Sequence, residues 1–555
     1  MREFIRKNKF FIGCWSIVFG ILSVVFSFYI TGFYFGNHDY QFMRYGMPLN
    51  AGVWEARITQ FVPYWLLFSG HILPVFSALF GFMFLAGAAV LLAKWYALPE
   101  KYSVVLLFAL LIVLHPYHLT QLYYAFIATS IGLWHLFAVI GVVTAWQFVL
   151  KKKLKWALIS VFFLLMALLG YASVLQMIFV ALIGKFLLSL GTDFQTARKK
   201  RALRQYWQPY ILTALFLSVV VLIFYGGIIH VLKAHHIIDM GMYNTQVLTA
   251  EEIIFKLKTF WYLPLKGLML ELPYCSPFIF RTILVLMIAL VLLSALLSGG
   301  WLVFLLMTVG IAGLIFTMFV TTYVSPWAAW SMMRTNVYSV PYFLAIMFAI
   351  LVVFENQFLK NLGMVAAVVL IICFANADFN AQKVWALGRM QDEKVADRMR
   401  KRLLPEINQD KHYRMILLGS FYGASKFADK MNIDEEKREI YREIYGWGLY
   451  LNKFASSGLF LYEPNNPIWA DVWFLGPWLV PNVANDTLRA QDMISVKMFS
   501  KKFGADKDKI WVAVDKMRPY PHKNFYYIGQ KDIILMLKRE EYNQSVLKAK
   551  LDEKK

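Results

Sequence analysis

Cysteine is scarce in this chain of 555 residues, which contains only three. Cys14 and Cys373 lie inside apolar runs, and Cys275 stands alone in a loop. A disulfide framework needs an even set of cysteines in a short secreted chain, and a thiolate metal site needs cysteines grouped at short spacings. The sequence therefore predicts neither a disulfide framework nor a cysteine metal site.

Motifs for nucleotide binding are also missing. The sequence contains no glycine-rich phosphate loop, no Walker lysine and no dinucleotide-binding fingerprint after a strand. The energy for any group transfer would then come from a substrate that is already activated.

Charged residues make up only 16% of the chain, whereas 59% of it is hydrophobic and the mean hydropathy is +0.54. A soluble chain is about half apolar and alternates apolar with polar positions, but the apolar runs here continue for many turns. Because the bilayer cannot hydrate unpaired backbone groups, such runs must form closed hydrogen-bonded structures. The sequence predicts a polytopic α-helical membrane protein.

The charge that is present is mostly basic, with a formal net charge of +22. The basic residues gather in short stretches beside apolar runs, as at 151–155 and 198–204. Cytoplasmic loops that face anionic lipid have this pattern, so it does not indicate a nucleic-acid partner. Arg2 and Arg6 precede the first apolar run and place the N-terminus in the cytoplasm.

We expect eleven spans, beginning with a first span that is too long for a signal peptide and is retained. The expected spans cover residues 10–35, 64–93, 103–115, 124–150, 156–190 (two spans with an apex at 170–173), 209–229, 282–297, 301–320, 340–354 and 362–377. The adjacent glycines Gly299 and Gly300 form the turn between the spans 282–297 and 301–320. This count places the C-terminus outside the cytoplasm.

Residues 1–377 are then a transmembrane domain, and residues 378–555 a soluble extracytoplasmic domain. Within the second domain, apolar segments near 415–420, 510–514 and 533–537 have the composition of strands. Residues 391–404 carry charge at helical spacing. The sequence therefore predicts an α/β or α+β fold for this domain.

The segment 35–57, between the first two spans, combines acidic, basic and aromatic residues at a membrane boundary. Charges there cost desolvation unless they are paired, hydrated or used. Asp39 lies just past the first span, where a general base could accept the proton of an acceptor hydroxyl, and Glu55 is the second candidate acid.

Cations on the same expected side could stabilise a leaving phosphate. Arg44, Arg57 and Arg334 can each form forked hydrogen bonds to phosphate oxygens. Further candidate substrate-binding residues are His38 and the pair His235 and His236, which could also coordinate a divalent ion. Each also has a simpler interpretation, as a helix cap, a local ion pair or a surface residue.

Four stretches suggest a known family. They are Asn37-His-Asp39 with Trp54-Glu-Ala-Arg57, residues 327–334 before a span that contains Pro341, residues 376–402 with an Asp392-Glu-Lys-Val-Ala-Asp run, and Met517-Arg-Pro-Tyr-Pro-His522 before residues 533–537. With these stretches the chain resembles the GtrII-type serotype-converting glucosyltransferases, a branch of the polytopic GT-C glycosyltransferases.

The resemblance implies transfer of a hexose, glucose in this family, from polyprenyl phosphate to a surface polysaccharide such as O-antigen. It implies a GT-C-like fold for residues 1–377 and a bacterial plasma (inner) membrane. It also implies inversion at the anomeric carbon, Asp39 as the base and Trp54 in the substrate site. A flippase and a polyprenyl-phosphate-glucose synthase would be partners. Many GT-C enzymes have two adjacent acidic residues here, whereas this chain has His38-Asp39, with Glu55 sixteen positions on. We therefore expect no metal cofactor, with a divalent cation as the alternative.

Three other functions compete with this hypothesis. A transporter or flippase of lipid-linked saccharides would need charged residues at mid-membrane depth and inverted repeats. An O-antigen polymerase or ligase would share the topology but would depend on one large outer loop. A non-catalytic assembly protein would tolerate the loss of Asp39.

Overall fold

The computed structural model divides the chain into two compact units. The first comprises residues 1–33, 46–382 and 439–449, and the second the remainder. The structure describes residues 2–32, 57–71, 73–122, 127–191, 193–199, 202–237, 275–318, 336–354, 356–407, 414–418, 516–518, 521–529 and 532–536, and the single residues 53, 254 and 268.

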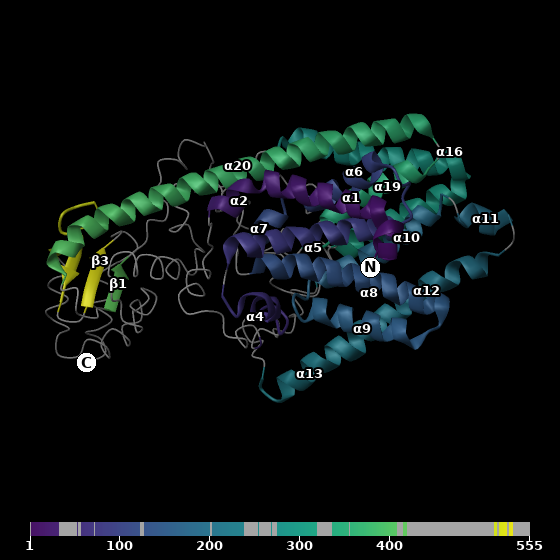
Figure 1. Ribbon diagram of the computed structural model, residues 1–555. Coiled ribbons are helices and arrows are strands. Elements are labelled where there is room, and N and C mark those ends of the chain that lie inside the picture. The colour runs from purple at the N-terminus through teal and green to yellow at the C-terminus, as the bar shows by residue number, and fades with distance from the viewer. Residues whose placement is uncertain are drawn as a thin grey trace. The chain divides into compact units, whose positions relative to one another are not determined.

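The described part of the first unit is built of helices (Figure 1). They are α1 (Arg2–Val25), α2 (Ser27–Gly32), α4 (Val62–Phe68), α5 (Pro74–Trp95), α6 (Tyr102–Val113), α7 (His118–Leu122), α8 (Ala128–Lys151), α9 (Leu154–Leu168), α10 (Val174–Ser189), α11 (Asp193–Lys199), α12 (Leu203–Val219), the π-helix η3 (Val220–Tyr225), α13 (Gly226–Ala234), α16 (Pro277–Met318), α19 (Val340–Val353) and α20 (Gln357–Leu403). Of α20, residues 357–382 belong to the first unit.

Six helices of the described residues are long and apolar enough to cross a membrane. These stretches are Arg6–Val25, Pro74–Trp95, Ala128–Lys151, Leu203–Ala234, Pro277–Met318 and Gln357–Lys383, and shorter apolar helices cover Tyr102–Val113, Leu154–Leu168, Val174–Ser189 and Val340–Val353. The chain therefore has the helical, membrane-embedded character that the sequence predicts. The count of eleven spans stays a prediction.

Two turns lie where the sequence places them. Gly300, inside α16, has a φ of 69°, which breaks the 42-residue element into two helices at the predicted Gly299-Gly300 turn. A side chain is strained at such a φ, so glycine suits this position. Helices α9 and α10 are separated by residues 169–173, which include the predicted apex.

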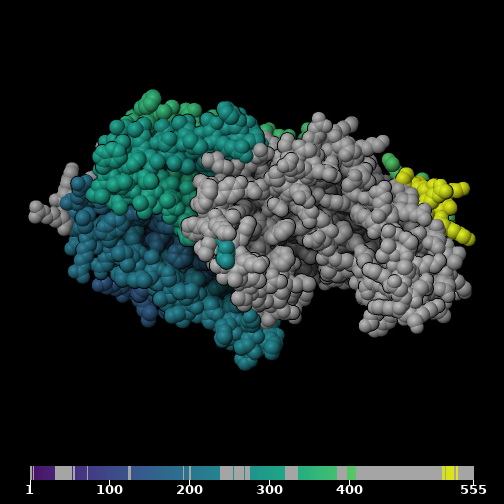
Figure 2. All heavy atoms as spheres, turned by 180° about the vertical axis from the view of Figure 1, so that it is seen from behind, coloured from purple at the N-terminus to yellow at the C-terminus, as the bar shows by residue number. Residues whose placement is uncertain are grey.

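Apolar side chains cover the outward faces of several helices. Leu222 in η3, Val309 in α16 and Phe358 in α20 are each exposed by 70% or more. The blue and teal surface in Figure 2 belongs to helices of this part of the chain. Exposed apolar area of this extent would drive association in water, so these faces are suited to contact lipid tails.

The interior contains one helix that is buried on all sides. Residues 340–352 of α19 are all buried, and this helix packs against α6, α10 and α16. Elsewhere glycines bring two backbones together: a Cβ added to Gly132 of α8 would stand 2.1 Å from the carbonyl oxygen of Gly81 in α5. Small residues at a helix crossing permit this close approach in membrane proteins.

The described part of the second unit contains a three-stranded sheet. β1 (Arg414–Leu418), β2 (Tyr526–Ile528) and β3 (Asp532–Met536) have the order β1-β3-β2. β1 pairs in parallel with β3, which pairs antiparallel with β2. β1 and β3 coincide with the predicted strands near 415–420 and 533–537, whereas the strand predicted at 510–514 lies outside the described residues.

The predicted end of the last span, at residue 377, is not the end of a helix. α20 continues without interruption to Leu403 and is followed by the 3₁₀ turn η5 (Leu404–Glu406). The apolar candidate span within α20 extends to Lys383. Asp378 and Gln382, placed in the soluble domain by the sequence, are fully buried residues of the first unit.

Candidate functional site: a polar and aromatic cluster at converging helix ends

Four turns of the first unit converge at one set of helix ends. These turns are residues 57–61, 114–117, 169–173 and 336–339. We define the turn cluster as these four turns, the helix α7, and the first two helical turns of α8 and of α10. The backbone N–H of Thr59 donates to the carbonyl of Leu169 over 3.2 Å, and its hydroxyl donates to the carbonyl of Met166 over 2.7 Å. Ser130 donates to the carbonyl of Gln60 over 2.6 Å. Hydrogen bonds thus join segments that are distant in the sequence.

Amide and hydroxyl side chains join the last turn to the others. Ser339 donates to Oε1 of Gln176 over 2.9 Å, and Nε2 of Gln176 donates to Oδ1 of Asn336 over 3.0 Å. The Tyr338 hydroxyl donates to Oε1 of Gln121 over 3.3 Å. All five side chains are buried. The hydrogen bonds among these side chains offset much of the cost of burying them.

A series of ring contacts leads from the half-buried Arg57 and Tyr171 to buried side chains of the turn cluster. Arg57 lies 5.5 Å above the ring of Tyr171, and both residues are half-buried. The Tyr171 ring stacks on Trp134 at 5.7 Å and contacts Tyr338, also at 5.7 Å. Tyr338 stacks in turn on His135 at 4.5 Å. A cation above the face of an aromatic ring gains electrostatic energy from the ring.

A glycine makes the Tyr171–Trp134 stack possible. A Cβ at Gly170 would stand 1.9 Å from Nε1 of Trp134. Only glycine therefore lets the turn that carries Tyr171 lie directly against α8. The close approach at Gly170 therefore sets how near Tyr171, and the Arg57 side chain above its ring, lie to α8.

Three buried histidines form the floor of the turn cluster. Nδ1 of His135 lies 2.6 Å from the hydroxyl of Tyr342, and the rings of His118 and His135 are 5.4 Å apart. Nε2 of His118 lies 3.0 Å from the carbonyl of Ile112 and can donate to it. Nδ1 of His115 accepts from the backbone N–H of Tyr117 over 3.2 Å. One nitrogen of each imidazole is thus held by the protein.

The second nitrogen of each imidazole is buried without a partner among the described residues. The atoms are Nε2 of His115, Nδ1 of His118 and Nε2 of His135, and Nδ2 of Asn336 is in the same state. A buried polar atom without a partner costs about 1–3 kcal/mol. These atoms could each bind a water or a hydroxyl group.

Burial lowers the pKa of His118 to about 4, because the interior of the protein disfavours the charged imidazolium. This imidazole is therefore neutral near pH 7. It offers hydrogen bonds and no fixed charge, so the cation of the turn cluster is Arg57.

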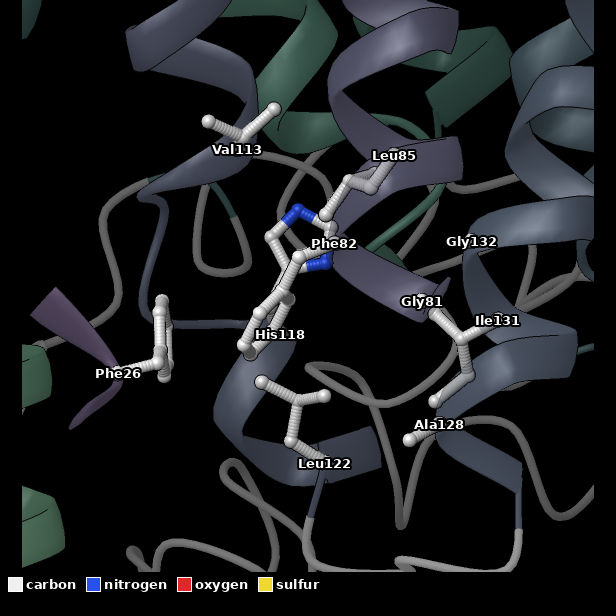
Figure 3. Close-up of a pocket in the computed structure, with 10 residues that line it drawn as sticks. All are labelled: Phe26, Gly81, Phe82, Leu85, Val113, His118, Leu122, Ala128, Ile131 and Gly132. Atoms are coloured by element: carbon white, nitrogen blue, oxygen red, sulfur yellow. The ribbon is translucent and has the colours of Figure 1, made fainter. Parts of the chain in front are cut away.

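A small cavity lies beside His118 (Figure 3). Its volume is about 10 Å³, measured as the space open to the centre of a water molecule, which is room for about one water. Figure 3 shows the His118 ring among apolar neighbours, including Phe26, Phe82 and Leu85. The cavity is too small for a sugar, so substrate would contact the half-buried side of the cluster at Arg57 and Tyr171.

Acidification should destabilise the folded protein through His118. The unfolded chain takes up the proton near pH 6.5, and the folded chain near pH 4, so the unfolded state binds more protons between these values. We expect the free energy of unfolding to fall by about 3 kcal/mol from this group as the pH drops through that window.

Thermal unfolding in detergent at pH 7.5, 6 and 5 measures this effect. His118→Gln should give a shallower dependence on pH than the wild type, and the exposed His71→Gln should serve as the matched control. An equally steep dependence in His118→Gln would contradict the assignment.

Three of the predicted site residues lie among the described residues. Arg57 belongs to the turn cluster. His235 and His236 are exposed just after α13, where their backbone N–H groups donate to the carbonyls of Val231 and Lys233. The other predicted residues, His38, Asp39, Arg44, Trp54, Glu55 and Arg334, lie outside the described residues, and their roles stay predictions.

The most deeply buried members of the turn cluster were not predicted from the sequence. His135, Gln176 and Tyr338 lie within or beside apolar runs. A hydropathy average over such a run stays apolar and does not reveal a single polar residue. A polar side chain inside an apolar span was the available signal, because such residues usually face a partner or a functional site. Among the described residues no group of three histidine, cysteine or acidic side chains could hold a metal ion.

No family model matches the chain, and neither the curated proteins nor the solved structures contain a match. The resemblance to GtrII-type glucosyltransferases therefore stays a prediction.

Proposed function

We propose that this protein is an integral membrane glycosyltransferase that moves a hexose from a polyprenyl-phosphate donor to a surface polysaccharide. The observation that carries the proposal is the half-buried Arg57, set over Tyr171 on a floor of neutral polar groups. This arrangement offers a fixed cation for a phosphate and an aromatic ring for a sugar. Both stand at helix ends, where an amphipathic donor could enter from the bilayer.

Sidedness supports the proposal. The helix ends that meet in the turn cluster include the end of α6, the start of α8, the end of α9 and the start of α19. The sequence assigns every one of these ends to the outer side of the membrane. The same assignment puts Asp39, Glu55 and Arg334 on that side, and Glu55 stands two positions before Arg57 in the chain.

The reaction would be a displacement at the anomeric carbon. An acceptor hydroxyl attacks this carbon, the bond from the carbon to the phosphate oxygen breaks, and the proton passes to the carboxylate of Asp39. The electron pair of the broken bond stays on the polyprenyl phosphate, whose growing charge Arg57, Arg44 and Arg334 would stabilise. Attack opposite the leaving phosphate inverts the anomeric carbon.

One observation favours a transporter of lipid-linked saccharide as the second candidate. Asp378 is a fully buried acid within the candidate span Gln357–Lys383, and both its carboxyl oxygens lack a hydrogen-bond partner among the residues that the structure describes. Buried acids in spans often serve proton or ion coupling. Asp378 lies close to the end of its span, however, and not at the middle depth that transport sites favour.

Replacement of Arg57 tests the central observation. We expect Arg57→Ala to lower the transfer rate about 10- to 100-fold, because a charge-assisted hydrogen bond contributes about 1.5–3 kcal/mol. Arg57→Lys should recover only part of the rate, since an ammonium group keeps the charge but loses the forked geometry.

Initial rates with a polyprenyl-phosphate hexose donor, in membranes with equal protein content, give the measurement. Arg204→Ala removes an exposed arginine from the start of α12 and is the matched control. Transfer at the wild-type rate in Arg57→Ala would remove the support that the turn cluster gives to this function.

A further inference from the structure

The connection between α8 and α9 concentrates positive charge. Four of the residues 151–155 are lysines, and the fifth is Leu154; we call this segment the lysine turn. All four lysine side chains are exposed, and none forms an ion pair with a carboxylate among the residues that the structure describes. Like charges held this close together repel each other, and an anion bound between them would relieve the repulsion.

The backbone of the lysine turn places a lysine where glycine is favoured. Lys152 has a φ of 53° and a ψ of 29°, in the left-handed region, and its N–H donates to the carbonyl of Phe148 over 2.7 Å at the end of α8. Glycine is the usual residue at such a helix end, because a side chain strains this backbone conformation. A strained residue of this kind points to a role for its side chain other than stability.

One aromatic ring attracts two of the four ammonium groups. Nζ of Lys151 and Nζ of Lys155 each lie 5.3 Å from the centre of the Trp156 ring. The electrons of an indole ring attract cations, so this ring keeps two mutually repelling lysines near one place. Trp156 is half-buried in the first turn of α9. Tryptophan is enriched at the level of the lipid headgroups in membrane proteins.

An apolar stripe continues from the lysine turn along α9. It consists of Leu154, Leu158 and Phe162, which follow at every fourth position and therefore share one face of the helix. Their side chains are exposed by 68%, 62% and 56%. A molecule bound along this face would meet cations at one end and apolar side chains over the rest of its length. An amphipathic anion matches both parts.

The lysine turn lies at the end of a candidate membrane span. α8 is such a span and ends at Lys151, and the apolar helix α9 begins at Leu154 and packs against α8 (Figure 1). Lysines at the end of a span reach the level of the lipid phosphates. The amphipathic anion that every cell membrane supplies at this level is an anionic phospholipid.

We propose that the lysine turn and the apolar stripe of α9 form a binding site for an anionic phospholipid. The lysines bind the phosphate of the headgroup, and an acyl chain lies along Leu154, Leu158 and Phe162. A zwitterionic phospholipid would meet the same stripe, but its headgroup carries an ammonium group that the lysines repel. This inference does not depend on the proposed transfer reaction.

Lys152→Gly separates a role in binding from a role in folding. Glycine adopts the backbone conformation of position 152 without strain, so the variant should unfold at the wild-type temperature or above it. One lysine near an anionic surface strengthens binding about fivefold, so we expect the Kd for phosphatidylglycerol to rise about three- to fivefold. Native mass spectrometry of delipidated protein, titrated with this lipid in detergent, measures the Kd, and thermal unfolding measures the stability.

Two other single variants are matched controls. Ala97→Gly relieves a left-handed residue, with a φ of 56°, in the exposed turn after α5 and changes no charge. Lys101→Gln removes an exposed lysine just before α6. Both should bind phosphatidylglycerol as the wild type does. A loss in Lys101→Gln as large as that in Lys152→Gly would show a general attraction of basic residues and would overturn the proposed site.

Removal of the other three charges enlarges the effect. Lys151→Gln, Lys153→Gln and Lys155→Gln, combined in one chain, should raise the Kd for phosphatidylglycerol by at least about tenfold. All three positions are exposed, so the triple variant should fold. Binding at the wild-type Kd by both Lys152→Gly and the triple variant, or no binding of this lipid by the wild type, would overturn the inference.

Two further ligands distinguish a lipid site from a site for free phosphate. Phosphatidylcholine with the same acyl chains should bind the wild type at least about tenfold more weakly than phosphatidylglycerol. Glycerol 3-phosphate at millimolar concentration should not displace phosphatidylglycerol, because it lacks the chains. Leu158→Gln, which interrupts the stripe and keeps every lysine, should weaken the binding of phosphatidylglycerol. Displacement by glycerol 3-phosphate, or equal Kd values for the two lipids, would contradict the proposal.

Discussion

Asp39→Asn should lower the transfer of hexose by a factor of about 10²–10⁴ without changing the amount of folded protein. The asparagine has nearly the same shape but cannot accept the proton of the attacking hydroxyl. Because no other step needs this carboxylate, donor binding should change little and the loss should appear in kcat. Radiolabelled hexose passing from polyprenyl phosphate to the acceptor polymer gives the measurement.

Two further variants make the result specific. Glu55→Gln tests the second candidate acid, and Asp193→Asn removes an exposed acid at the start of α11, on the opposite side of the membrane in the predicted topology. Equal transfer by Asp39→Asn and the wild type would show that the base lies elsewhere, with Glu55 tested next. If no variant and no wild-type sample transfers sugar, the transporter hypothesis, supported by Asp378, becomes the better one.

Gly132→Ala should abolish the close crossing of α5 and α8 and prevent accumulation of folded protein. The new methyl group would stand 2.1 Å from the carbonyl oxygen and 2.8 Å from the carbonyl carbon of Gly81. These are backbone atoms, so the two helices must separate for the methyl group to fit. The cost should exceed the roughly 1–3 kcal/mol of ordinary overpacking in a core.

A second glycine provides a control, because its replacement by alanine should not destabilise the protein. Gly20 of α1 has no neighbouring atom within 4 Å of an added Cβ. Gly20→Ala should leave the fold intact or stabilise it by roughly 0.5–1 kcal/mol, since alanine loses less conformational entropy in a helix. Fluorescence-detected size exclusion and thermal unfolding of both variants give the comparison. A well-folded Gly132→Ala protein would show that the α5–α8 crossing is looser than the structure has it.

Local chemistry made much of the helical framework predictable. The turn at Gly300 followed from two adjacent glycines in an apolar run, and the separation of α9 from α10 followed from a stretch too long for one span between two basic clusters. The strands β1 and β3 followed from short apolar runs between polar stretches. In each case the signal and the structure it predicts lie in the same few residues.

The candidate site was predicted only in part. Arg57 was identified as a cation beside a span, but its ring partner Tyr171 and the floor formed by His118 and His135 come from other helices. Their meeting depends on Gly170, whose missing side chain lets one turn lie against Trp134. No sequence window that contains Arg57 holds this information.

The sequence by itself determined that the chain is a helical membrane protein, because the cost of burying unpaired backbone groups in lipid leaves long apolar runs few other structures. Tertiary structure alone decided which residues surround Arg57 and which distant segments meet. Gln382 reaches Tyr29 across 353 positions, and Gly81 meets Gly132 across a helix crossing. A hydropathy profile averages over residues that are adjacent in the sequence. These contacts depend instead on the shapes of side chains that come together only when the chain folds.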